Sequence, residues 1–203
     1  MDIQARVRAI LDAEAAAIRA IEVTPAFEQA VLALRDCRGK ILTTGIGKAG
    51  HIARKVASTF CSTAVPADFV HPAEAAHGDL GIAGPRDCII AFSTSGKSLE
   101  VLEMLELSRH LGVETVIGVT SHPDSTLRDY ADIILDMGEI EEACPLRLAP
   151  STSTTVMLAI GDALALTLME LRGVTREEFG LRHHGGYLGR KARTDNVPHE
   201  GQA

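Results

Sequence analysis

Short apolar runs alternate along the chain with longer segments in which apolar residues recur every three or four positions. A short apolar run between turn residues is typical of a strand buried on both faces, and the longer period is that of an amphipathic helix. We predict strands at residues 40–44, 67–70, 87–92, 115–119 and 133–136, with helices at 48–62, 99–111 and 125–130 between them. Strands that alternate with helices predict an α/β fold, in which three αβα layers surround a doubly wound, five-stranded parallel sheet.

Three more helices lie outside this repeat. Residues 3–21 and 25–37 precede the first strand, and we expect these extra N-terminal helices to cover a sheet edge or to pack against another subunit. Residues 151–172 are apolar nearly all round, which is typical of a helix buried in a core or in an oligomer interface. The apolar run within that helix is interrupted by Gly161 and Asp162 and is shorter than a bilayer requires.

The stretch at residues 88–107 combines a buried strand, a hydroxyl-rich turn and a helix. The hydroxyl groups of the turn belong to Ser93, Thr94, Ser95 and Ser98. Hydroxyl donors beside the free backbone N–H groups of a helix N-terminus favour the binding of a phosphate group. Glu100 follows in the first helical turn, where it is a potential general base beside whatever the phosphate carries.

Other interpretations of this turn were weighed against a phosphate site. Clusters of Ser, Thr and Gly are ordinary in turns and helix N-caps, so a generic strand–turn–helix unit is also compatible with the sequence. Gly96-Lys97-Ser98 is the ending of a Walker loop, but the first glycine of that motif would fall at Ala91, inside the strand. The hydroxyl density favours a small phosphorylated ligand over a nucleotide.

Composition narrows the class of protein. The 203 residues suffice for a single domain at residues 1–193, followed by a polar tail at 194–203 that we expect to be disordered. A net charge of −7 and 3% aromatic residues argue against a nucleic-acid partner. The N-terminus has no apolar core of a signal peptide, so we predict a cytoplasmic protein that is not bound to a membrane. Four cysteines without a C-x-x-C pair are expected to be reduced, mostly buried thiols: Cys37, Cys61, Cys88 and Cys144.

Further candidate functional residues lie in the loops that follow the strands, because open α/β sheets bind ligands at the carboxyl ends of their strands. Lys48 belongs to the glycine turn at residues 45–50, where a cation at a helix start opposes the helix dipole and so favours a functional role. Glu141 and Glu142 belong to the loop at 139–149, where a solvated pair is an equally good interpretation. Additional candidate substrate contacts in the first turn and at the start of the last long helix are Thr44, Gly45, Gly47, Ser151 and Thr152.

The histidines form two groups. His71 and His77, with Asp79, have the residue types of a metal site, but they lie on one irregular segment at 71–84 without a helical HxxxH pair or a cysteine, so we predict no metal. His183 and His184 near the end of the chain fit a surface position and a functional position equally well.

Six segments, in this order, resemble the sugar isomerase (SIS) domain of arabinose-5-phosphate isomerases: GIGKAGHIARKVAST, FVHPAEAAHGDLG, AFSTSGKSLE, EEACPLRLAPSTSTT, GDALA and HHGGYLGRKA. Enzymes of this family belong to the pathway to the lipopolysaccharide sugar Kdo. The resemblance covers residues 40–192 and implies a flavodoxin-like SIS fold and a homo-oligomer, a dimer or tetramer, with active sites at subunit interfaces. It implies interconversion of D-ribulose 5-phosphate and D-arabinose 5-phosphate without a metal or organic cofactor.

The resemblance also implies roles for individual residues. Ser93, Thr94, Ser95 and Ser98 would hold the phosphate. The positions that match catalytic or nearby residues of the family are Lys48, Glu100, Glu142, His183 and His77. Moving a carbonyl between C1 and C2 requires a base for the α-proton and a cation for the enediolate oxygen. We hypothesise that one of the two glutamates carries the proton, that the lysine stabilises the oxyanion and that one of the two histidines assists ring opening.

The chain departs from the family in several places. Family members commonly continue into a pair of CBS domains, whereas this chain stops after the isomerase domain, and its polar ending favours a naturally short form over a truncated one. Lys97 stands where the family usually has Glu, Thr94 where Asn is common, and His184 where Pro completes an HPGG motif. Two other functions therefore stay open: an isomerase of another sugar phosphate, such as a hexulose 6-phosphate, and a non-catalytic regulator that binds a phosphosugar.

Overall fold

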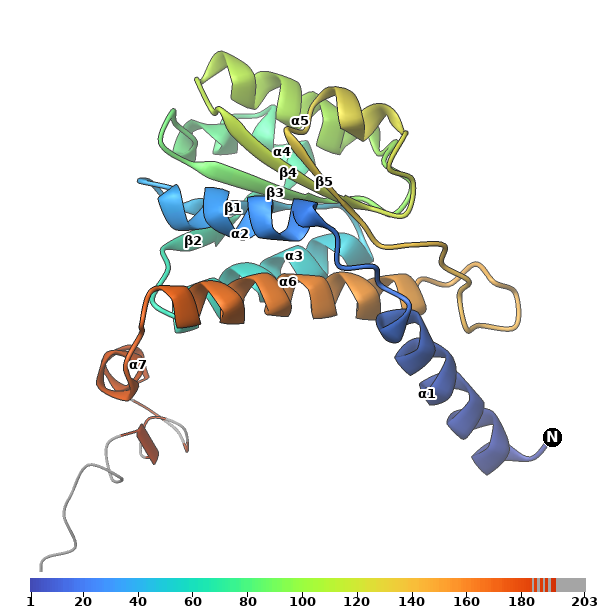
Figure 1. Ribbon diagram of the computed structural model, residues 1–203. Helices are drawn as coiled ribbons and strands as arrows, with labels where there is room; N and C mark the ends of the chain where they lie inside the picture. The colour runs from blue at the N-terminus through green and yellow to red at the C-terminus, as the bar shows by residue number, and fades with distance from the viewer. Residues whose placement is uncertain (184, 186, 188, 190, 193–203) are drawn as a thin grey trace, which may run out of the picture.

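The computed structural model describes residues 1–183, 185, 187, 189, 191 and 192 (Figure 1). The predicted tail at 194–203 and the side chain of His184 therefore lie outside the described residues. Five parallel strands form one sheet in the order β2-β1-β3-β4-β5. They are β1 (Ile41–Thr44), β2 (Ala67–Phe69), β3 (Cys88–Phe92), β4 (Thr115–Thr120) and β5 (Ile133–Asp136). The predicted doubly wound sheet is confirmed, and its strand order reverses between β1 and β3.

Helices cover both faces of the sheet, because alternate side chains of a strand point to opposite faces. On β3, Cys88, Ile90 and Phe92 belong to one core, and Ile89 and Ala91 belong to the other. The first core is shared with α2 (Pro25–Asp36), α3 (Lys48–Ser62) and α6 (Thr152–Leu171), and the second with α4 (Pro72–Ala75) and α5 (Leu99–His110) (Figure 1). The central strand is thus apolar throughout because it has no solvated face.

Several short elements were not predicted. The segment at 71–84, expected to be irregular, contains α4 and the 3-10 helix η1 (Asp79–Ile82), and the predicted helix at 125–130 is the 3-10 helix η2 (Thr126–Asp129). A further helix, α7 (Arg176–Arg182), begins with a capping box in which the Thr175 hydroxyl accepts from the Glu178 N–H and the Glu178 carboxylate accepts from the Thr175 N–H. This motif is visible in the sequence as T-x-x-E and predicts a helix start.

The first helix, α1 (Ile3–Arg19), projects away from the sheet; its later turns pack beside α6, and near its start Arg6 Nη2 donates to the carbonyl of Ala143 in the 139–149 loop (Figure 1). The expectation that it covers a sheet edge is wrong. Large apolar side chains on it are exposed, including Ile3 at 69%, Val7 at 53% and Leu11 at 52%. An apolar groove of about 530 Å³ runs between the end of α1, α2 and α6, and its lining includes Ile21 and Leu164. Packing of α1 against another subunit stays a prediction.

Two expectations about buried segments need correction. Helix α6 spans 20 residues, so by length and composition alone it could cross a bilayer, and the expectation that it is too short is wrong. In this fold it packs against α3, α2 and the first core instead. The four cysteines are free thiols, but Cys88 is the single buried one, while Cys61 is exposed.

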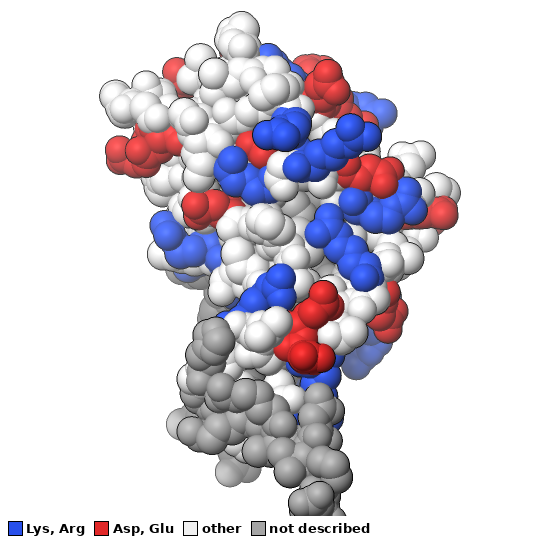
Figure 2. All heavy atoms as spheres, turned by 90° about the vertical axis from the view of Figure 1, so that its left-hand side faces the viewer, with Lys and Arg blue, Asp and Glu red and all other residues white. Residues whose placement is uncertain are grey.

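The surface charge is mixed on the side of the molecule where α6 ends. Figure 2 shows Lys and Arg interspersed with Asp and Glu over this side. A continuous basic stripe, which a nucleic-acid backbone requires, is therefore not present on the face drawn.

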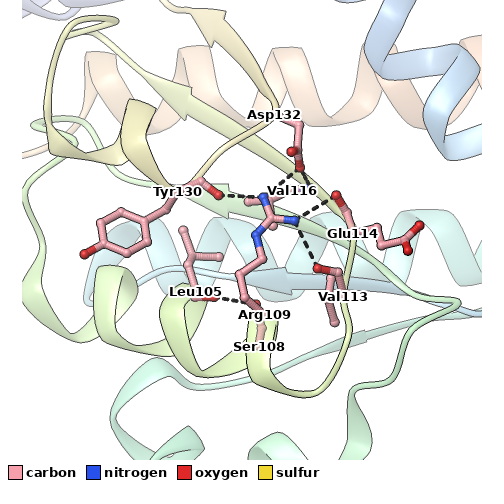
Figure 3. Close-up of polar contacts among 8 residues, drawn as sticks. All are labelled: Leu105, Ser108, Arg109, Val113, Glu114, Val116, Tyr130 and Asp132. Atoms are coloured by element: carbon pink, nitrogen blue, oxygen red, sulfur yellow. Dashed lines mark hydrogen bonds and ion pairs between the residues drawn. The ribbon is translucent and has the colours of Figure 1, made fainter.

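Arg109 at the end of α5 ties together the connections that lead into β4 and β5 (Figure 3). Its Nη1 donates to the carbonyls of Val113 (3.0 Å) and Glu114 (2.7 Å), and its Nη2 donates to the carbonyl of Tyr130 (3.0 Å) and to Asp132 Oδ2 (2.8 Å). The same carboxylate oxygen accepts from the N–H at the second residue of β4, at 2.7 Å. One guanidinium thus satisfies three carbonyls that face no strand or helix partner.

Replacing Arg109 with Met should lower the free energy of unfolding by about 1–2 kcal/mol, because the partly shielded carbonyls and the carboxylate lose their charged donor. Urea unfolding followed by circular dichroism would measure the shift of the midpoint at constant slope. Arg35→Met is the matched control, since the Arg35 side chain pairs with exposed Asp36 and should leave the midpoint nearly unchanged. Equal shifts for the two variants would contradict the role given to Arg109.

Candidate active site

The turns that follow β1 and β3 lie against each other at the point where the strand order reverses. A Cβ at Gly45 would lie 3.1 Å from the carbonyl oxygen of Phe92, and one at Gly50 would lie 2.6 Å from the carbonyl oxygen of Gly45. Glycine at both positions therefore permits a close backbone approach that a larger residue would block. As a result, Lys48 at the start of α3 stands beside the end of β3.

The hydroxyl-rich turn after β3 has a fixed shape. Gly96 has a φ of +62°, and a Cβ there would collide with the side chain of Ser125. Within the turn, the Ser93 and Ser98 hydroxyls are 3.0 Å apart. The Thr94 carbonyl accepts from three donors at the end of β4 and in the loop after it, which hold the turn against that loop. They are Ser121 N (3.1 Å), Thr120 Oγ1 (3.1 Å) and His122 Nδ1 (3.0 Å).

These turns enclose a cavity of about 270 Å³, which we call the hydroxyl cavity. Its lining residues are Ile46, Lys48, Ala49, Phe92, Ser93, Thr94, Ser95, Ser98, His122, Pro150 and Thr154. The titratable groups in this lining are an amine and an imidazole, and none of the lining residues is an acid. In a chain with a net charge of −7, a pocket lined by hydroxyls and one lysine is suited to an anion.

Glu142 lines a separate cavity with Glu141 and Arg147, but its carboxylate is bound by the start of α6, next to residues that line the hydroxyl cavity. Its Oε2 accepts from the N–H of Ser151 at 2.8 Å and from that of Ser153 at 3.4 Å, while the neighbouring Pro150 and Thr154 line the cavity. Partial burial raises the pKa of the Glu142 carboxyl, but hydrogen bonds from the Ser153 hydroxyl and from N–H groups of the helix start outweigh it, so the pKa lies below its ordinary value. The group is therefore ionised at neutral pH, as a general base must be.

The other residues predicted to contact substrate at this edge lie around the cavity and outside its lining. Thr44 is buried and donates to the carbonyl of Val70 at 2.9 Å, so its hydroxyl serves the fold. Gly47 caps the start of α3, and Ser151 caps the start of α6. The Thr152 hydroxyl accepts from the N–H of Ala143 at 3.1 Å, which holds the 139–149 loop on the helix. These positions frame the cavity rather than line it.

Three other candidates lie outside the cavity lining. Glu100 is exposed on the first turn of α5, two residues after Ser98. His77 is exposed after α4. Glu141 pairs with Arg147 at 3.1 Å, where both side chains are largely exposed. As for a metal, the described residues contain no group of three or more His, Cys, Asp or Glu side chains that could hold one.

His183 lies at the other end of the subunit from Lys48. Its ring stacks on Phe179 with centroids 3.9 Å apart, and its Nδ1 lies 2.8 Å from the carbonyl oxygen of Phe179. With Arg182 it lines a separate cavity of about 430 Å³ beside Cys61 and other residues at the C-terminal end of α3. Because α3 has 15 residues, its two ends are roughly 22 Å apart. The two candidates therefore cannot meet within one subunit.

Six lining residues are absent from the contacts predicted from the sequence: Ile46, Ala49, Phe92, His122, Pro150 and Thr154. Substrate contacts at the start of the last long helix are predicted at Ser151 and Thr152, whereas the residue of this helix in the lining is Thr154. No spacing or composition signal distinguishes His122 from a surface histidine, because the bond from its ring to the Thr94 carbonyl joins residues 28 positions apart.

Comparison with known proteins bears on this arrangement. Residues 33–167 match the family model of the SIS domain. The chain belongs to the SIS domain family.

Several SIS proteins are similar to this chain over most of its length. Arabinose 5-phosphate isomerase KdsD of Yersinia pestis is 48% identical over 86% of this chain and 54% of its own length. KdsD of Pseudomonas aeruginosa is 46% identical over 81% of this chain and 51% of its own length. The chain thus spans about half the length of these curated relatives.

Two solved structures are covered almost completely. An E. coli CFT073 protein in complex with A5P is 39% identical, with a TM-score of 0.85, over 90% of this chain and 97% of that chain. A candidate phosphosugar isomerase involved in capsule formation from Bacteroides fragilis is 44% identical, with a TM-score of 0.85, over 89% of this chain and 97% of that chain. These comparisons confirm the predicted SIS fold, whereas the roles of individual site residues stay predictions.

Replacing Gly96 with Ala should destabilise the protein by about 1–2 kcal/mol or more, because an L-residue is strained at this positive φ and its Cβ would meet Ser125. It should also abolish binding of inorganic phosphate, since the hydroxyl turn would have to move. Thermal unfolding and isothermal calorimetry would measure the two effects. Gly81→Ala is the control, because a Cβ there meets nothing within 4 Å. Unchanged phosphate binding in the Gly96 variant would contradict this site.

Proposed function

We propose that this chain is an aldose–ketose isomerase that interconverts D-ribulose 5-phosphate and D-arabinose 5-phosphate. The observation that carries the proposal is the hydroxyl cavity, which combines Ser93, Ser95 and Ser98 with Lys48 and has an ionised carboxylate, Glu142, beside it. The names of the similar proteins, arabinose 5-phosphate isomerase and a complex with A5P, support the choice of sugar.

In this proposal the hydroxyls of the turn hold the phosphate and leave the carbonyl end of the open-chain sugar near Lys48 and Glu142. A carboxylate, Glu142 or Glu100, takes the proton from the carbon next to the carbonyl and returns it to the neighbouring carbon. The ammonium of Lys48 stabilises the negative charge that develops on the enediolate oxygen. A positioned general base contributes roughly 10²–10⁴-fold to such a rate, and a preorganised charge at an oxyanion contributes about 10²–10³-fold.

His183 enters this proposal from a second subunit, because it cannot reach Lys48 within its own chain. The exposed apolar face of α1 and the apolar groove beside α6 support an oligomer, since contiguous apolar surface marks association sites. We therefore propose a cytoplasmic homo-oligomer, a dimer or tetramer, in which His183 or His77 of a neighbouring subunit assists ring opening. Its product would serve the pathway to Kdo.

The reaction is tested by a coupled assay with D-ribulose 5-phosphate, a hexulose 6-phosphate and fructose 6-phosphate. We expect turnover of the ribulose ester, with kcat reduced about 10²-fold or more in Glu142→Gln and in Lys48→Met. Glu103→Gln, on an exposed position of α5, is the control and should retain full activity. Near-normal activity in both Glu142→Gln and Glu100→Gln would contradict the mechanism, and binding without deuterium exchange at the substrate would indicate a regulator.

Mixed oligomers test the shared site. Lys48→Ala and His183→Ala subunits should each be nearly inactive alone, and unfolding and refolding them together should restore a substantial fraction of the activity. Recovery follows because some sites then combine an intact Lys48 from one subunit with an intact His183 from another. Two differently tagged variants show by affinity capture that mixed oligomers have formed. No recovery in captured mixtures would contradict a site shared between subunits.

A further inference from the structure

His122 is a wall of the hydroxyl cavity, although neither its sequence neighbourhood nor the names of the similar proteins point to it. It lies in the loop after β4, and its ring reaches back to the turn after β3, where Nδ1 is 3.0 Å from the carbonyl oxygen of Thr94. The backbone N–H of His122 donates to Thr120 Oγ1 at 3.1 Å, which holds the backbone of the loop in place. One hydrogen bond thus holds the exposed ring on the hydroxyl turn, and another holds the loop backbone that carries it.

The hydrogen bond to Thr94 decides what the rest of the ring can do. A carbonyl oxygen only accepts, so Nδ1 must carry a proton. A neutral ring then has a bare Nε2, which can accept but cannot donate. A positively charged ring keeps the same bond through Nδ1 and presents an N–H at Nε2 as well. Among the residues that the structure describes, Nε2 has no hydrogen-bond partner, so it is available to a ligand.

The charges around the cavity favour the positively charged form of the His122 ring when an anion is bound. Lys48 on α3 is the cation in the lining, and the residues that the β3–α5 turn and the start of α6 contribute to the lining carry no titratable side chains. Three acids lie nearby but do not line it: Asp124 on the same loop and Glu100 on α5 are exposed, and Glu142 is bound by the start of α6. Lys97 in the β3–α5 turn is likewise exposed and outside the lining. A phosphate monoester carries close to two negative charges at neutral pH, and the Lys48 ammonium is assigned to the enediolate oxygen in the proposed mechanism, so the phosphate charge needs a further positive partner.

We propose that His122 binds the phosphate group of the substrate as an imidazolium, donating its Nε2–H to a phosphate oxygen while Nδ1–H stays on the Thr94 carbonyl. This rests on the proposed function only in that the cavity holds a sugar phosphate. Binding of the phosphate is then coupled to the uptake of a proton by the ring. His122 is a binding residue and takes no part in the proton transfer between carbons.

The test is calorimetric titration of wild type and His122→Asn with inorganic phosphate, D-ribulose 5-phosphate and unphosphorylated D-ribulose. Asparagine can still donate to the Thr94 carbonyl, but it has no group in place of Nε2. We expect the dissociation constants of both phosphate ligands to rise about tenfold or more, since a charged hydrogen bond is lost. His110→Asn at the exposed end of α5 is the matched control and should bind as wild type.

Repeating the titrations at pH 7.5 in two buffers of different ionisation enthalpy measures the protons taken up on binding. At this pH the sugar phosphate, a monoester with a second pKa of about 6, is almost fully dianionic, so for this ligand the difference between wild type and His122→Asn reports the ring. Wild type should take up more protons than the variant. Equal uptake, or equal affinity for inorganic phosphate, would overturn the proposal, and so would a loss that is confined to the sugar phosphate, because the ring would then contact a sugar hydroxyl.

The failure of this proposal can be told apart from the failure of the proposed function. Phosphate binding that depends on His122, in a protein without isomerase turnover, would support the imidazolium contact and remove the isomerase. If turnover and phosphate binding are both unchanged in His122→Asn, the isomerase is supported and the imidazolium contact is removed. If wild type binds neither phosphate ligand, both proposals fail.

Discussion

The close approach of the turns after β1 and β3 is the constraint on which the site depends. Parallel strands end at one edge of the sheet, and at the reversal of strand order no helix crosses directly between those two ends. Gly45 lets the two backbones come together there, and Gly50 lets α3 begin close against Gly45, which places the lysine at the start of α3 beside the hydroxyls at the end of β3. Neither turn would form a binding cavity alone, because one supplies the charge and the other supplies the donors.

Helix starts are used in two opposite ways around this cavity. At α6, the carboxylate of Glu142 accepts from the free N–H groups, which lowers its pKa and keeps it ionised. At α3, Lys48 adds a positive charge to a terminus that is already positive, an unfavourable arrangement in the empty protein. A bound dianion would relieve that repulsion. The site therefore holds its carboxylate in a stable state and its cation in a less stable one, which favours binding of an anion.

Most of the fold could be predicted from the sequence, because a strand buried on both faces is an apolar run and α3 and α5 have clear periodicity. Bounds agree to within one or two residues at β3 and α3. The short helices α4, η1 and α7 escaped prediction because they are too short to show a period, and α1 was placed wrongly because an apolar stripe does not say what covers it.

The hydroxyl turn and the lysine could be found from local chemistry. His122 could not, since its contact with Thr94 exists only after the sheet has formed, and the separation of His183 from Lys48 depends on the length of α3.

The guanidinium of Arg109 holds the segments that enter β4 and β5, at the sheet edge opposite to the one that carries the hydroxyl cavity. The residues that hold the strand entries together and the residues that line the cavity are thus separate sets. Mutations that reshape the ligand-binding loops need not disturb the guanidinium contacts, and the scaffold can tolerate a change of ligand preference without refolding. Variation among proteins with this architecture is therefore expected to accumulate at one rim of the sheet while the other rim remains nearly constant.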